Sequence, residues 1–134
     1  MKSVLKISDA ASIAMHAILI LSQNQDSLIS VKYIAEKLEV SSNHLSKVMQ
    51  RLTKTGFVES IKGNKGGFRL IISPEKIKLL DIYEAIDGKL EPKNCLLKKR
   101  ICDGKGCVLG NLAVSLNKQV KEYFKKTSFG DFIK

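Results

Sequence analysis

Apolar residues recur at helical spacing through the first half of the chain. The segment from Asp9 to Gln23 is apolar on nearly every face, which is typical of a helix buried on several sides. Ser30 and Ser41 stand just before two further segments, where a serine hydroxyl can accept a hydrogen bond from a backbone N–H of the first turn. Gly56 follows the second segment and favours the end of a helix. The pattern predicts helices over residues 9–23, 31–38 and 42–55.

The helix predicted over residues 42–55 has two contrasting faces. Apolar positions recur at i, i+3, i+4 and i+7, and polar or basic residues occupy the opposite face. Two short helices joined by a tight turn, the second basic on its outer side, are typical of a helix-turn-helix. The apolar set is Leu45, Val48, Met49 and Leu52, and the polar set is Asn43, Lys47, Gln50 and Lys54.

The hydrophobic period changes after the helix-turn-helix. Residues 57–61 and 68–72 have the pattern of strands. They flank the stretch from Lys62 to Gly67, whose three glycines allow the positive φ that a hairpin tip needs. A basic hairpin directly after a recognition helix predicts the wing of a winged helix.

The remaining residues predict a long helix after an irregular segment. Residues 79–86 have helical spacing up to Gly88, whereas residues 89–107 have no period. The apolar stripe over residues 108–126 lies outside the winged-helix unit, and a second copy of the chain is its simplest partner; the alternative is that it folds back on the first helix. We expect a mainly α fold with a small β wing, divided into a winged helix-turn-helix domain (1–88), a cysteine loop (89–107), and a dimerisation helix and tail (108–134).

The charge of the chain indicates a polyanionic partner. The 134 residues carry a net charge of +10, concentrated in residues 40–72 and 93–134. This clustering favours nucleic acid over membrane, although a basic surface that only confers solubility is the alternative. The longest apolar run, Met15 to Leu21, is too short to span a bilayer, and no signal peptide precedes it, so we expect a cytoplasmic protein. No constellation of acid, base and nucleophile indicates an enzyme.

The expected DNA contacts lie at the start of the second helix and on the hairpin. Asn43 can pair with adenine through two hydrogen bonds, and Lys47 can reach O6 and N7 of guanine. Ser41 is equally suited to cap the helix, and Asn43 and His44 are also compatible with a merely solvated face. The full set of expected contacts is Ser41, Ser42, Asn43, His44, Lys47, Lys54, Lys62, Asn64, Lys65 and Arg69.

The cysteines indicate a metal or redox site. Their odd number and the lack of a secretory signal argue against a disulfide scaffold. Two glycines within residues 103–106 allow the loop to bring the thiols together. The spacing is not that of paired zinc-binding cysteines, and only His16 and His44 could complete a zinc site. Iron–sulfur, zinc and free redox thiols therefore stay open. The three cysteines are Cys95, Cys102 and Cys107, separated by six and four residues.

Three stretches of the chain resemble the IscR/NsrR-type family of winged-helix regulators. They are the run VSSNHLSKVMQRLTKTGFVESIKGNKGGFRL with its wing motif from Gly63 to Leu70, the cysteine triplet, and the tail from Thr127 to Phe132. The similarity covers essentially the whole chain. The string from Asn43 to Lys47 looks most like the nitric-oxide-sensing branch.

This resemblance implies a dimeric, DNA-binding transcription regulator, which we expect to be a repressor. It also implies a [2Fe–2S] or [4Fe–4S] cluster held by the three cysteines and a fourth, non-cysteine ligand, with DNA affinity changing on cluster loss or nitrosylation. Such proteins space their cysteines about five residues apart, and the IscR-like branch has a histidine where this chain has Gly110. That difference argues against an IscR-like [2Fe–2S] site.

In the nitric-oxide-sensing branch the fourth ligand is an aspartate from the first helix of the partner subunit. The resemblance places this aspartate at Asp9, which could also cap that helix. His16 or an exogenous thiol is the alternative ligand. Two rival functions remain: a winged-helix regulator that senses through zinc or bare thiols, and a small iron–sulfur electron-transfer or scaffold protein.

Overall fold

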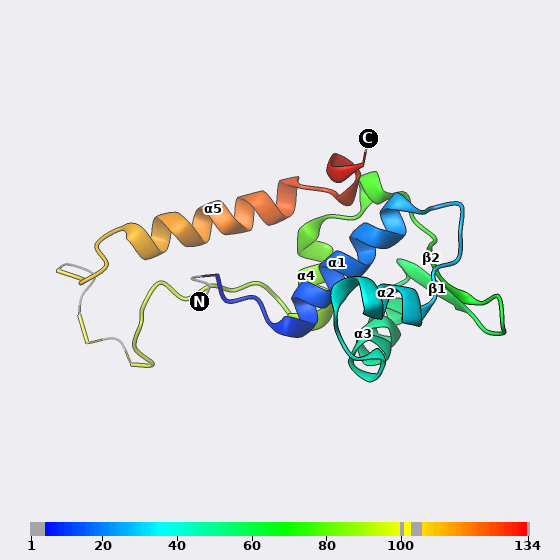
Figure 1. Cartoon of the computed structure of the whole chain (residues 1–134). Helices are drawn as coiled ribbons and strands as arrows, with labels where there is room; N and C mark the ends of the chain where they lie inside the picture. Colours follow the sequence, from blue (N-terminus) through cyan, green and yellow to red (C-terminus); the bar gives the residue numbers. More distant parts are fainter. Residues whose placement is uncertain (1–4, 100, 103–105, 134) are drawn as a thin grey trace.

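The computed structural model describes residues 5–99, 101–102 and 106–133. It confirms a mainly helical fold with a two-stranded antiparallel wing (Figure 1). The α-helices are α1 (Asp9–Gln23), α2 (Val31–Leu38), α3 (Ser42–Lys54), α4 (Leu79–Asp87) and α5 (Leu112–Lys126). The strands are β1 (Val58–Ile61) and β2 (Gly67–Leu70), and two short 3-10 helices are η1 (Pro74–Lys76) and η2 (Phe129–Phe132).

Serine caps fix the start of the first three helices. Ser30 accepts a hydrogen bond from the N–H of Tyr33, and Ser41 accepts one from the N–H of His44, both at 3.1 Å. These bonds confirm the caps predicted for α2 and α3. For α1 the capping side chain is Ser8, which accepts from the N–H of Ala11 at 3.0 Å. The local sequence therefore accounts for each of these starts.

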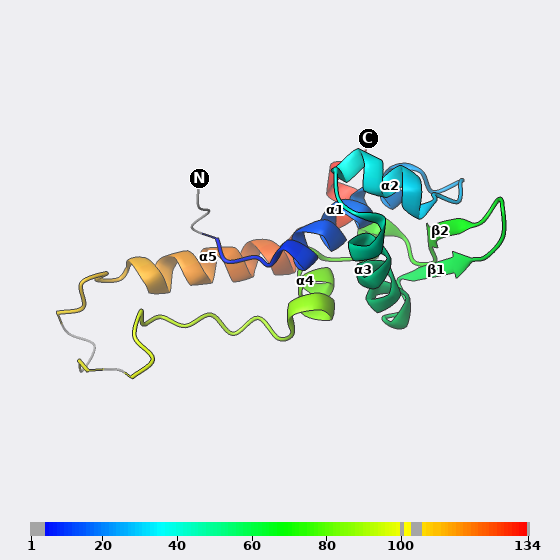
Figure 2. The same ribbon diagram turned by 60° about the horizontal axis from the view of Figure 1, so that its bottom comes forward.

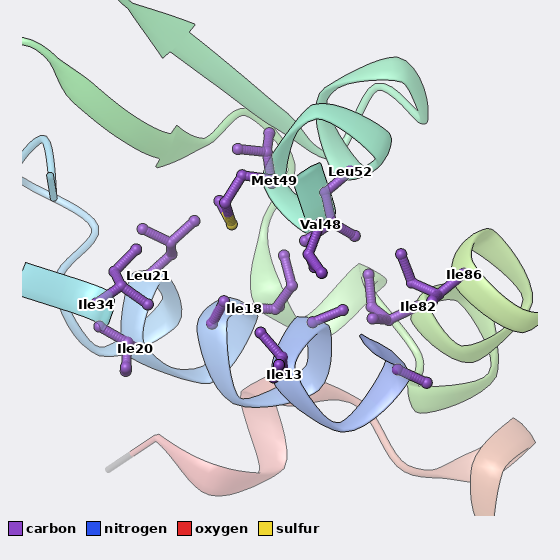
Figure 3. Close-up of a cluster of buried hydrophobic side chains, with 14 of the residues drawn as sticks. Ile13, Ile18, Ile20, Leu21, Ile34, Val48, Met49, Leu52, Ile82 and Ile86 are labelled. Carbon is purple, nitrogen blue, oxygen red and sulfur yellow. The ribbon is translucent and has the colours of Figure 1, made fainter. Parts of the chain in front are cut away.

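The core forms where α1, α3 and α4 meet (Figure 3). Ala11, Ala14 and Ala17 of α1 are fully buried, and such small side chains let neighbouring helices approach closely. The inner face of α3 is the apolar set predicted from its spacing. The larger side chains of this cluster are Ile13, Ile18, Leu21, Ile34, Leu45, Val48, Met49, Leu52, Ile82 and Ile86.

The hairpin is shorter than the strands predicted over 57–61 and 68–72. Its register pairs Glu59 with Arg69 and ends with Ile61 opposite Gly67. Gly66 lacks the positive φ expected of the three glycines; a Cβ there would lie 2.0 Å from the carbonyl oxygen of Ile61. Gly67 also packs closely on the backbone of Ile29, since a Cβ would lie 2.6 Å from the carbonyl oxygen of that residue. Both glycines are needed for close backbone approach.

The long helix begins at Leu112, four residues after the predicted start at 108. Gly110 has a φ of +55°, and its N–H donates to the carbonyl oxygen of Cys107 at 2.9 Å, so a turn precedes the helix. The helix then projects away from the body on the side opposite the wing (Figure 1). The C-terminal end of α5 is attached to the body. There the buried ring of Phe124 packs edge to face on the ring of Tyr83 in α4, with the ring centroids 5.7 Å apart. Burial raises the pKa of Tyr83, and the charges of Asp87 and Glu84 raise it further.

The tail after α5 packs on the body. The N–H of Leu79 donates to the carbonyl oxygen of Thr127, and the N–H of Phe129 donates to that of Ile77, both at 3.0 Å. Phe129 is 2% exposed. A Cβ at Gly130 would come within 2.7 Å of the Glu75 side chain. The tail is thus joined to the segment that leads into α4, although the sequence grouped this tail with the dimerisation helix.

Candidate DNA-binding face and cysteine site

The outer face of α3 is a solvent-exposed polar stripe. Asn43, Lys47 and Lys54 lie opposite the buried face, at positions that share one side of the helix. The expected contact residues of the wing are also exposed to solvent, and the wing lies beside this helix (Figure 2). All of the expected DNA contacts are exposed: Ser41, Ser42, Asn43, His44, Lys47, Lys54, Lys62, Asn64, Lys65 and Arg69.

Two basic residues of this region already have partners. Arg69 forms an ion pair with Glu59 across the hairpin, so a phosphate would have to compete with that carboxylate. Arg51 donates from Nη2 to the carbonyl oxygen of Ile86 at 2.5 Å and ties α3 to α4. The sequence shows Arg51 only as part of a basic cluster, because its acceptor lies 35 residues away. Lys62 and Lys65 at the wing tip are the more available cations.

The three cysteines line one hollow. Cys95, Cys102 and Cys107 surround a space of about 160 Å³ together with apolar side chains, including Leu97 and Ile101. None of the three forms a disulfide. The structure thus places cysteines that span twelve residues of the chain around one hollow. Asp103, Gly104 and Lys105, which belong to the cysteine loop predicted from the sequence, lie outside the described residues.

The three cysteine thiols that line this hollow are chemically suited to bind an iron–sulfur cluster. Thiolates are the ligands that such clusters prefer. The apolar side chains beside them, Leu97 and Ile101 among them, are exposed to solvent. Within the described part of the chain, no three His, Cys, Asp or Glu side chains stand close enough to hold a metal ion. The cysteines lie in irregular chain, so closing the thiols on a common centre requires movement of a loop rather than of the core.

Asp9 lies in a different pocket. It lines a space of about 470 Å³ between α1 and the helix-turn-helix, together with His16 and His44. The Nδ1 atom of His16 forms a hydrogen bond of 2.7 Å with the carbonyl oxygen of Ser12. Ser8 is the helix cap, so capping does not require the Asp9 carboxylate. Within one subunit the aspartate and the cysteines belong to separate pockets.

The geometry defines a class of protein. Two short helices joined by a turn, followed by a hairpin wing and carrying a polar exposed outer face, constitute a winged helix-turn-helix. Such a unit binds DNA. In the described residues no helix is both long and apolar enough to traverse a membrane.

The chain belongs to the Rrf2 family of transcriptional regulators. The family profile, described as "Iron-dependent Transcriptional regulator", matches residues 7–134. An HTH-type transcriptional regulator from Aquifex aeolicus is 34% identical over 94% of this chain and 90% of its own length. The regulator NsrR of Halalkalibacterium halodurans is 41% identical, over 54% of this chain and 50% of its own.

Solved structures share this fold over almost the whole chain. CymR, the global cysteine regulator of B. subtilis, superposes with a TM-score of 0.80 at 25% identity, covering 96% of both chains. IscR of T. potens gives a TM-score of 0.72 at 26% identity, covering 96% of this chain and 86% of its own. These likenesses agree with the winged helix predicted from the sequence, and the family is one of transcriptional regulators rather than enzymes.

Proposed function

We propose that this regulator is a repressor that senses nitric oxide, redox state or iron–sulfur supply through a cluster held by Cys95, Cys102 and Cys107. The observation that carries the proposal is that all three cysteines line one hollow. The likeness of the string from Asn43 to Lys47 to the nitric-oxide-sensing branch, and the similarity to proteins named NsrR, support the choice of signal.

The proposed mechanism links the cysteine segment to the DNA-binding face. A bound cluster would supply iron that reacts with nitric oxide or oxidants. With the three thiolates fixed, the segment that precedes α5 holds one arrangement, and with them released it relaxes. Because α5 is the proposed subunit contact, this relaxation changes the spacing of the two recognition helices, which no longer match the operator half-sites.

The proposal is tested by the composition of the protein purified without oxygen. We expect a brown protein with visible absorbance, iron and acid-labile sulfide, and a changed spectrum after nitric oxide. Zinc in stoichiometric amount without sulfide would favour the second candidate, a regulator that uses zinc or bare thiols. Protein without metal that still responds to oxidants would indicate bare thiols.

Substitutions on the two parts of the DNA-binding face should have different effects. Lys62→Ala in the wing is expected to weaken binding to all sequences alike and to reduce the salt slope by about one, because it removes a phosphate contact. Asn43→Ala should instead lose about 1–3 kcal/mol of discrimination at particular base pairs. Titrations of selected and random DNA over a range of salt check both. Equal weakening of both DNAs by Asn43→Ala would make Asn43 a positioning residue.

Asp9 is proposed as the fourth ligand, donated by the partner subunit. Its place in a pocket without cysteines of its own subunit, and the cap supplied by Ser8, support this role. A carboxylate is a harder ligand than a thiolate and should exchange more readily, which suits a point of attack by nitric oxide.

Asp9→Ala is therefore expected to alter the visible spectrum or speed cluster loss, with little change in the melting of the cluster-free protein. The matched control is Ser8→Ala, which should keep the spectrum and cost about 1–2 kcal/mol of stability, because it removes both the cap and the hydrogen bond that the Ser8 hydroxyl donates to Asp87. An Asp9→Ala protein with the wild-type spectrum and nitric oxide response would remove Asp9 from the site.

A homodimer is proposed because α5 leaves an apolar stripe uncovered. Leu112, Leu116 and Tyr123 are all exposed, and one face of this helix needs a partner. Sedimentation should give twice 14.9 kDa at micromolar concentration. Leu116→Glu should shift the protein to the monomer, whereas Lys118→Glu on the same helix should not. A wild-type monomer would contradict both the dimer and the half-site mechanism.

A further inference from the structure

The segment between α4 and the first cysteine runs beside α5 (Figure 2). Near its start, half-buried Leu90 packs on the core, and its N–H donates to Oε2 of Glu84 at 2.8 Å. The next residues, 91–94, are exposed. Packing therefore does not fix the chain where it reaches Cys95.

Asn117 of α5 supplies a polar attachment at this point. Its Nδ2 donates to the carbonyl oxygen of Lys93 and to Oδ1 of Asn94, both at 2.9 Å. The two acceptors come 24 and 23 residues earlier in the chain and directly precede Cys95. An amide turned the other way would place its oxygen against a carbonyl oxygen, so the Lys93 contact determines which end of Asn117 donates.

The third cysteine lies in the turn just before the same helix. The carbonyl oxygen of Cys107 accepts from the N–H of Gly110 in the turn that leads into α5. Both ends of the cysteine segment therefore lie near α5. Cys107 precedes its N-terminus by one turn, and the residues before Cys95 are hydrogen-bonded to Asn117 of the helix. Cys102 lies between them in the chain and lines the same hollow.

We infer that Asn117 is a positioning residue for the cysteine site, holding Cys95 near the other two thiols. The inference rests on the proposed cluster. A site built from thiols on irregular chain must overcome the conformational freedom of that chain each time it closes. The Asn117 amide removes part of this freedom beforehand, and it ties the site to the helix proposed as the subunit contact.

The test compares cluster release from four variants reconstituted with ferrous iron and sulfide. Asn117→Ala should release its cluster to a chelator about fivefold faster than wild type, the factor that corresponds to one hydrogen bond. Asn117→Asp should do so at least as fast, because its carboxylate faces two acceptor oxygens. Asn94→Ala removes one of the two acceptors and should have a smaller effect. Gln119→Ala is the control, since that exposed amide bonds to Ser115 Oγ of its own helix.

Visible absorbance gives the release rate, and melting of the cluster-free proteins gives the stability. A lower melting temperature for Asn117→Ala with wild-type release would show a merely structural role and overturn the inference. Wild-type release from both Asn117 variants would also overturn it, while leaving the cluster proposal intact. Failure of the wild-type protein to take up iron and sulfide would instead contradict the proposed function. If the Asn117 variants cannot be loaded at all, faster release from Asn94→Ala than from Gln119→Ala still supports the inference, and equal release rejects it.

Discussion

Replacing Cys107 by alanine is expected to abolish retention of the cluster without unfolding the protein. Cys107 is one of three thiols on the hollow, and two thiolates cannot replace a three-thiolate site. The residue lies in irregular chain outside the core, so the stability of the cluster-free protein should change by no more than about 0.5 kcal/mol. Iron and sulfide analysis and melting of the cluster-free protein check the two parts.

The control for this substitution is Val108→Ala. Val108 adjoins Cys107, lines the same hollow and is 91% exposed, so its truncation trims the edge of the hollow and leaves every thiol in place. The Val108→Ala protein should retain its cluster and its nitric oxide response. The Cys107→Ala protein should bind DNA with one affinity, whatever the treatment with nitric oxide. Wild-type iron and sulfide in Cys107→Ala would exclude this cysteine as a ligand.

Phe129→Ala should cost about 3–5 kcal/mol of unfolding free energy. The side chain is 2% exposed, and η2 packs against α1 and η1, so truncation leaves a cavity in the body. A loss of this size is a large part of the roughly 5–15 kcal/mol that stabilises a typical domain. Urea unfolding of the cluster-free protein measures it.

Phe132 offers the matched comparison in the same short helix. It is 45% exposed, so Phe132→Ala should cost less than about 1 kcal/mol. Similar losses for the two variants would contradict the packing of this tail on its own winged-helix body. The comparison therefore tests whether the chain after α5 stabilises the DNA-binding unit.

The helices and the wing could be predicted because their signals are local. Ser30 and Ser41 cap helices within three residues of themselves, and the spacing of the apolar face of α3 needs no knowledge of distant chain. The wing follows from its glycines and its place after α3. Even in the wing, the positive φ predicted for Gly66 is wrong. This position needs glycine because the Ile61 carbonyl leaves no room for a Cβ, and the sequence does not show that approach.

The remaining features depend on residues far apart in the sequence. The pairing of Ile77 with Phe129, and the bond from Arg51 to Ile86, join segments whose approach is set by the whole fold. The late start of α5 depends on the left-handed conformation of Gly110. The number and spacing of the cysteines indicate only a candidate site. Their common hollow, and the contact of Asn117 beside it, required the structure.

In the proposed mechanism, the state of the cysteine site controls recognition of a specific operator. The most direct test of this mechanism is the affinity of one anaerobic sample, with its cluster shown by iron and sulfide content, for selected and random DNA before and after nitric oxide. We expect nitric oxide to weaken binding to selected DNA at least about tenfold, a coupling of about 1.4 kcal/mol, and to change binding to random DNA little. Equal affinity for selected DNA in the two states would exclude this mechanism.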